Sequence, residues 1–179
     1  TETGRQFLEE ARIDNEDLIS EESMKVTGKT VEELRDVSKQ SQKELIGHFF
    51  NFVEQSTIKN LLCQNPAGLD VPLLSIKSGK YGFKIPYSHR SFDLHTIASL
   101  KYFQINKQFL NKDGKSDFGL SKILEFCGMI DERRAVKEGK LVKEGKPHNA
   151  LEDAKLTAEC FSRIVYGKNL LEEYAKFSI

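Results

Sequence analysis

Long apolar runs are absent from this sequence, and so is an excess of either charge. No apolar stretch approaches the roughly 20 residues that a membrane-spanning helix needs, and no signal-like segment opens the chain. We therefore expect no membrane partner and a cytoplasmic location. Basic and acidic residues number 27 each, so the net charge is zero and binding to a polyanion would have to come from a local patch.

Cysteine is scarce and shows no metal-binding spacing. The three cysteines, Cys63, Cys127 and Cys160, are scattered and odd in number, as expected for buried reduced thiols rather than a disulfide framework. The remaining composition, 30% charged and 39% hydrophobic over 179 residues, is typical of a globular protein, and we assign residues 1–179 to a single domain. The first residue is Thr1 rather than methionine, so we expect a fragment or a processed chain.

Hydrophobic spacing and turn residues predict a chain of α/β type in which strands and helices are mixed. The predicted elements are a strand over 5–13, a short helix over 20–26 stopped at Gly28, a capping-box helix from Thr30, an amphipathic helix over 45–53, a strand over 58–63, a helix over 71–76, a loop over 77–90, a strand-to-helix segment over 91–103, a turn over 112–115, a helix over 120–127, a polar loop or hairpin over 131–146, a helix from residue 150 and a final helix over 169–177.

Asp70 follows the predicted strand 58–63 through a loop rich in Asn, Pro and Gly. In open α/β sheets ligands gather at this end of a strand. An aspartate just before a helix is also a common N-cap. The residues support the two interpretations about equally.

The segment 77–90 interleaves lysines with aromatic residues. Lys80 and Lys84 stand close to Tyr81, Phe83 and Tyr87, a mixture that can line a groove for a single strand through phosphate contacts and base stacking. A partly packed surface loop has the same composition and is the commoner case.

Two other histidine positions have simple structural explanations. Asp93 and His95 resemble a metal pair, but residues at a strand-to-helix junction more often serve caps and local hydrogen bonds. His48 lies inside the amphipathic helix beside two phenylalanines, where a surface or boundary role is far commoner than ligation.

The stretch 147–154 places a histidine five residues before an aspartate. Asn149 is a good N-cap and Glu152 follows three residues later, as in a capping box. Asp153 then lies in the first helical turn, while we expect His148, just before the cap, to be free to swing. A mobile base beside a fixed carboxylate suits metal-assisted hydrolysis. The spacing alone is common by chance, because acidic residues favour first turns.

Three segments occur in an order that resembles a known family. They are Asn-Pro-Ala-Gly-Leu-Asp at 65–70, Gly-Leu-Ser-Lys-Ile-Leu at 119–124, and Pro-His-Asn-Ala-Leu-Glu-Asp-Ala at 147–154. Together they resemble the DEDDh 3′–5′ exonucleases, the group of DNA-polymerase proofreading subunits, ribonuclease T and oligoribonuclease. The last segment is the most specific, since it is close to the family's third motif. Residues 20–34 also resemble the family's segment after its third strand.

The resemblance implies a ribonuclease H-like mixed sheet flanked by helices, and a two-metal hydrolysis of phosphodiester bonds at single-stranded DNA or RNA 3′ ends. Two Mg²⁺ or Mn²⁺ ions would be held by Asp70 and Asp153, with His148 as general base. Asn65, Lys80 and Lys84 would contact the nucleic acid. A homodimer or a polymerase partner is compatible with the family.

The chain departs from the family at two places. The family's first motif, Asp-x-Glu-Thr, has no full counterpart: Thr1-Glu2-Thr3-Gly4 is either its remnant or, as we favour, a turn before the third strand, with strands one and two missing. In the second motif Asp70 stands five residues after Asn65 rather than four, and Gly68 is the extra residue of a wider turn. Without the first-motif carboxylates we expect an inactive chain. The rival hypothesis is a catalytically inactive module on the same fold that binds nucleic acid or protein.

Overall fold

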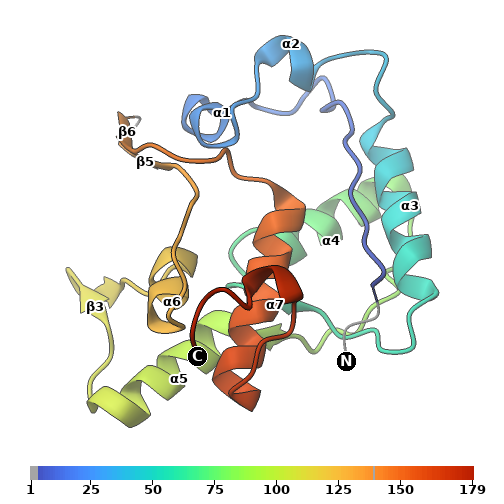
Figure 1. The fold of residues 1–179 in the computed structure, drawn as a ribbon. Coiled ribbons are helices and arrows are strands. Elements are labelled where there is room, and N and C mark those ends of the chain that lie inside the picture. The colour runs from blue at the N-terminus through green and yellow to red at the C-terminus, as the bar shows by residue number, and fades with distance from the viewer. Residues whose placement is uncertain (1–3, 139) are drawn as a thin grey trace.

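The computed structural model describes residues 4–138 and 140–179, and in them α7 occupies the centre of the molecule (Figure 1). The helices are α1 (Glu21–Thr27), α2 (Val31–Leu34), α3 (Gln42–Glu54), α4 (Asp70–Tyr81), α5 (Leu94–Asn106), α6 (Leu120–Phe126) and α7 (Ala150–Tyr166), with a short 3₁₀ turn η1 (Glu172–Tyr174).

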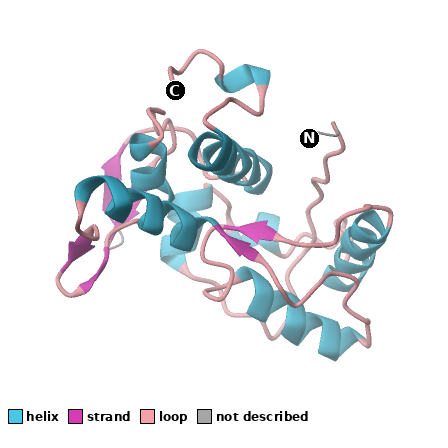
Figure 2. Ribbon diagram, turned by 90° about the horizontal axis from the view of Figure 1, so that it is seen from below, coloured by secondary structure: helices cyan, strands magenta, loops and turns pink. Residues whose placement is uncertain are grey.

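The strands are short and pair two by two (Figure 2). The pairs are β1 (Leu62–Cys63) with β2 (Phe92–Asp93) in parallel, β3 (Asn111–Lys112) with β4 (Lys115–Ser116) antiparallel, and β5 (Ala135–Lys137) with β6 (Lys140–Lys143) antiparallel. The predicted mixture of helices and strands is confirmed. Within residues 4–138 and 140–179 the strands form three separate pairs rather than one mixed sheet.

Helix boundaries follow the predicted local signals. Ser20 caps α1, which ends at Gly28 with a φ of 76°, a left-handed conformation that costs glycine little. The capping box between Thr30 and Glu33 is present. Asn149 caps α7 by accepting hydrogen bonds from two backbone amides. Glu152 does not return the bond, because its carboxylate accepts the Tyr174 hydroxyl instead.

Several predicted elements are wrong in type or extent, and the strand over 58–63 is reduced to β1. Residues 5–13 form no strand: they run beside α3 and α2, with only isolated backbone bonds such as Ile13 N to Leu34 O at 2.9 Å. Residues 169–177 contain only η1, because tail carbonyls and amides bond to side chains of α7. The segment 77–90 is not a loop throughout, since α4 continues to Tyr81.

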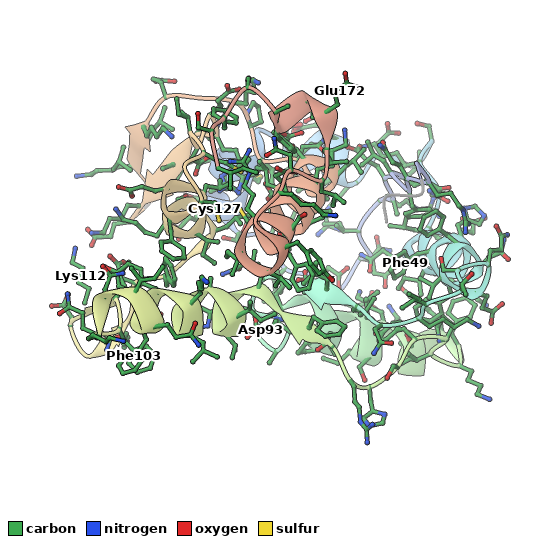
Figure 3. All side chains as sticks on the ribbon, turned by 60° about the horizontal axis from the view of Figure 1, so that its bottom comes forward. Phe49, Asp93, Phe103, Lys112, Cys127 and Glu172 are labelled. Carbon is green, nitrogen blue, oxygen red and sulfur yellow. The ribbon has the colours of Figure 1, made fainter. Side chains whose placement is uncertain are left out.

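The main core lies between α5, α6, α7 and the C-terminal tail. Its fully buried side chains include Leu94 of α5, Ile123 and Leu124 of α6, and Cys160 of α7. Cys127, labelled in Figure 3, faces α7 across this core. Cys127 and Cys160 are buried and free, as predicted, whereas Cys63 is only partly buried.

An acidic turn over residues 14–17 ties the N-terminal segment to α4. Lys77 Nζ lies 2.8 Å from Asp17 Oδ1 and 3.2 Å from Asp14 Oδ2, and Lys80 and Tyr81 also bond to Asp14. Residues 5–17, which we name the strap, are therefore fastened at both α3 and α4. None of the helices in the described residues has the length and apolar character to cross a membrane.

Candidate functional site

The β5–β6 hairpin folds the chain back so that residues 132–134 lie beside residues 145–146. Arg134 N donates to Lys146 O at 2.8 Å, and Lys146 N donates to Glu132 O at 3.0 Å. We call this contact the crossing. Gly145 permits it, because a Cβ there would lie 2.6 Å from the carbonyl carbon of Arg133 and from Glu132 O. The crossing ends at Lys146, so it fixes where the backbone lies two residues before His148.

His148 is fixed between three elements rather than free to swing, so that prediction is wrong. Its backbone amide donates to Val26 O of α1 at 3.2 Å, and its ring Nε2 lies 3.0 Å from Arg134 O. A carbonyl oxygen only accepts, so Nε2 carries a proton in this arrangement. The other ring nitrogen, Nδ1, lies 3.6 Å from Asp153 Oδ2.

Asp153 is shared between His148 and an arginine. It lies in the first turn of α7, as predicted, with its side chain one-third exposed. Its Oδ2 faces His148, and its Oδ1 accepts from Arg133 Nη1 at 2.9 Å. The predicted pair of His148 and Asp153 is therefore brought together, and a third residue joins it.

Arg133 and Asp131 are site residues that the sequence reasoning missed. Arg133 is 6% exposed and donates two hydrogen bonds to Asp131, from Nε at 2.9 Å and from Nη2 at 3.0 Å. Burial disfavours the charged form of Asp131, but hydrogen bonds from Arg133 and Ser121 outweigh it and hold the Asp131 pKa well below its usual range. The sequence of the polar segment 131–146 does not distinguish Arg133 from its neighbour Arg134. Only the crossing, which the sequence does not reveal, places Arg133 beside Asp153.

Asp70 stands apart from this trio. It is the first residue of α4 and not its cap, since the cap position is Leu69 and no side chain caps the helix. Its carboxylate makes no hydrogen bond or ion pair within the described residues. Desolvation by the surrounding protein raises its pKa, and its charge in turn contributes to raising the pKa of Cys63, after burial of that thiol.

The loop between β1 and α4 is held in place by the Asp93 side chain. Figure 3 labels Asp93 where β2 passes into α5. Its carboxylate accepts from the backbone amides of His95 at 3.0 Å and Asn65 at 2.9 Å. The predicted capping role of Asp93 is confirmed. Asn65 has a φ of 56° and its side chain lies against Gly68, which forms the wider turn.

The two predicted lysine contacts have different environments. Lys80 belongs to α4 and bonds to Asp14 and Glu16, which raise its pKa, so a phosphate would have to compete with two carboxylates for it. Lys84 is exposed and has no ion-pair partner among the described residues. All three residues assigned to nucleic acid, Asn65, Lys80 and Lys84, are exposed.

A cavity of about 400 Å³ adjoins the trio. It is lined by Arg133, Asn149 and Glu152 on one side and by tail residues such as Tyr174 and Lys176 on the other. Among the described residues no group of three or more His, Cys, Asp or Glu side chains is placed to hold a metal ion. Asp153 has its charge matched by Arg133, and Asp70 lies outside that contact, so the described residues do not by themselves fit the two-ion site.

No family model, curated protein or solved structure matches this chain. Function must therefore be inferred from the residues and their geometry. The arrangement contains a histidine with one nitrogen toward a carboxylate and a buried arginine that shares this carboxylate. The unpaired carboxylate of Asp70 at the start of α4 stands apart from it. Such a pair of histidine and carboxylate can move a proton.

Proposed function

We propose that this chain is part of a DEDDh-type 3′–5′ exonuclease with a ribonuclease H-like fold, acting on single-stranded DNA or RNA ends. The observation that carries the proposal is the contact between His148 and Asp153 at the start of α7, with 3.6 Å between Nδ1 and Oδ2. Three further features support it. Helix α7 packs against β1, β1 pairs in parallel with β2, and Asp70 opens the helix after β1.

The roles of the chain's own residues follow from these contacts. Asp153 Oδ2 lies 3.6 Å from Nδ1 of His148, while Nε2 carries the ring proton toward Arg134 O. The ring could accept a proton from water at Nε2 once it turns away from Arg134 O and its own proton sits on Nδ1, toward Asp153. Lys84 supplies an exposed cation for the phosphate backbone. When bound, divalent ions in such enzymes activate water and stabilise the leaving oxygen. Asp153 and Asp70 are the residues that would hold Mg²⁺ or Mn²⁺ here, and further carboxylates would be needed beside them.

The second candidate function is a nucleic-acid-binding module without catalysis. It is favoured by the ion pair between Arg133 and Asp153, which commits the best-placed carboxylate to a protein cation. Both hypotheses predict that a single strand binds, and they differ in whether it is shortened.

A nuclease assay with a 5′-labelled single strand distinguishes them. If the proposal is correct, the protein completed with an upstream first-motif segment releases mononucleotides stepwise from the 3′ end in the presence of Mn²⁺, and His148→Ala in that protein lowers the rate by roughly 10²–10⁴-fold, the usual contribution of a positioned base. The matched control is His95→Ala, because within the described residues the His95 side chain bonds to Ser116 of the β3–β4 hairpin and lies outside the trio. Binding without shortening, measured by fluorescence anisotropy, would favour the inactive module. Absence of both would overturn both functions.

A further inference from the structure

Two hairpins of this chain share one sequence pattern and one arrangement of charge. The sequence is Lys-Asp-Gly-Lys from Lys112 to Lys115 and Lys-Glu-Gly-Lys from Lys137 to Lys140. Lys112 of β3 stands directly opposite Lys115 of β4, and Lys137 of β5 stands directly opposite Lys140 of β6. We propose that these two lysine pairs form a binding surface for the phosphates of a single-stranded nucleic acid. The inference rests on the proposed function, because it names the surface that holds the strand assigned there.

Each lysine pair brings two like charges together without a counter-charge. Side chains that stand directly opposite on antiparallel strands are close neighbours on one face, so like charges there repel. All four lysines are exposed, and none of them has an ion pair or a side-chain hydrogen bond within residues 4–138 and 140–179. Each hairpin also carries one acid between its lysines, Asp113 or Glu138, which bonds to neither of them in the described residues. A phosphate beside the two ammonium groups would relieve their repulsion.

The two lysine pairs lie on the same side of the molecule. Figures 1 and 2, whose views differ by 90°, both show the β3–β4 and β5–β6 hairpins projecting on the side away from α3. The β5–β6 hairpin also leads into the crossing, which fixes the backbone two residues before His148. A strand bound along this side would therefore be held on a segment that is joined directly to the candidate site.

An exposed aromatic pair next to the first hairpin favours nucleic acid over an acidic protein as the partner. The rings of Phe103 in α5 and Phe109 stack with their centroids 4.8 Å apart, and the two residues are 38% and 54% exposed. Phe109 stands three residues before Lys112, and Figure 3 labels Phe103 and Lys112 at the same end of α5. Bases stack on exposed aromatic rings while lysines neutralise the phosphates between them. A run of carboxylates would engage the lysines alone.

The test measures binding of a labelled oligothymidylate of about 20 nucleotides, longer than one domain usually covers, by fluorescence anisotropy without divalent ions. The variants are Lys112→Gln/Lys115→Gln and Lys137→Gln/Lys140→Gln. Each should lower the slope of log affinity against log salt concentration by about 1.4, since each phosphate contact with a single strand contributes about 0.7. The matched control, Lys43→Gln/Lys59→Gln, removes the same charge from α3 and the segment after it and should keep the slope of the wild type.

A further variant tests the aromatic pair. Phe109→Leu keeps an apolar side chain but removes the ring, so we expect it to weaken binding by roughly 5–100-fold, the usual contribution of one stacked base, with the salt slope unchanged. Poly-glutamate of equal charge should compete poorly. Effective competition by poly-glutamate together with wild-type affinity of Phe109→Leu would overturn the proposal in favour of an acidic protein partner.

The lysine variants decide the rest. A wild-type slope in both hairpin variants overturns the proposal, and so does a lowered slope in only one of them, because the surface is assigned to both hairpins. A wild type that does not bind the oligothymidylate overturns it as well.

A measurement on the wild type covers the case in which a variant fails to fold. Reductive methylation, read by mass spectrometry, should be slowed by the oligothymidylate at the four lysines of the pairs and unchanged at Lys43 and Lys59. Equal rates at the lysine pairs with and without the oligothymidylate would overturn the surface. The strand-shortening assay decides the exonuclease separately: shortening that does not need the lysine pairs leaves that function standing, and binding at the pairs without shortening leaves this surface standing.

Discussion

Two buried arginines, Arg163 and Arg133, are equally exposed at 6% but make different contacts. Arg163 lies in the core and donates to Glu159, to Asn169 and to four backbone carbonyls, those of Cys127, Tyr174, Phe177 and Ser178. Arg133 donates to two aspartates and weakly to a serine. Burial alone therefore does not separate a structural arginine from one at a candidate site.

The two arginines differ in the carboxylate to which each one bonds, Glu159 for Arg163 and Asp153 for Arg133. Glu159 is completely buried, and its second oxygen accepts from the amides of Leu170 and Leu171, both at 2.9 Å. Its hydrogen-bonding capacity is used within the protein. Asp153 is one-third exposed and faces a histidine. An exposed carboxylate that shares its arginine can exchange partners with solvent, an ion or a substrate, whereas a saturated buried one cannot.

The largest expected effect comes from removing the core arginine. Arg163→Met leaves Glu159 buried without a counter-charge, and we expect a loss of about 3–5 kcal/mol in the free energy of unfolding. Arg133→Met should cost less, about 1–3 kcal/mol, because water can reach Asp153. Urea denaturation of both variants measures the difference. Equal losses would show that the two arginines have the same structural role.

The next effect concerns the crossing that carries Arg133. Gly145→Ala places a Cβ within 2.6 Å of backbone atoms that cannot give way, so we expect a loss of about 1–3 kcal/mol. Hydrogen exchange at the amides of Arg134 and Lys146 should accelerate. Gly79→Ala is the control: a Cβ there meets nothing within 4 Å, and alanine inside a helix should gain about 0.5–1 kcal/mol. A Gly145→Ala variant as stable as the wild type would contradict the close contact.

The smallest effect concerns the strap, whose ion pairs are only partly buried. Burial would raise the pKa of Asp14, but hydrogen bonds from Lys80, Tyr81 and Lys77 outweigh it and lower the pKa to about 2 from the ordinary 3.8. Since the folded pKa lies below the unfolded one, the stabilisation is fully present above pH 3.8 and is lost as pH falls toward 2. We expect about 1 kcal/mol or less, because these pairs still reach solvent.

Proteolysis of the strap as a function of pH measures this loss. Cleavage within residues 5–17 by an acid-active protease should increase as pH falls through this range, and the variant Asp14→Asn should show high cleavage already at pH 5. A strap in Asp14→Asn that is as protected as the wild type at pH 5 would contradict the role of the carboxylate.

Local signals made part of the fold predictable. Caps such as Ser20, Thr30 and Asn149 act on the next few residues, and those helices begin where they were predicted. The strand over 5–13 was wrong because side-chain bonds hold this segment, such as those of Glu9 with Gln40 and with His48 of α3, and alternation in sequence does not report them. The tail was wrong because Arg163 and Glu159 bond to its backbone groups.

Only the part of the candidate site that is close in sequence, His148 and Asp153, could be predicted. His148 and Asp153 lie within one short segment, so their proximity follows from the cap and first turn of α7. Arg133 reaches Asp153 from 20 residues away through a hairpin and a backbone crossing, neither of which has a residue pattern of its own. Whether Asp70 belongs with them depends on longer-range placement, for which the sequence has no signal.

The strap has a consequence for the order in which the chain folds. Its bonds from Lys77, Lys80 and Tyr81 to Asp14 join residues 63, 66 and 67 positions apart, so each requires closure of a long loop before any contact is gained. Helix α6 meets its chain neighbours α5 and α7 over shorter separations, which favours early formation of those contacts. The N-terminal segment would then dock last, on a C-terminal half that is already folded.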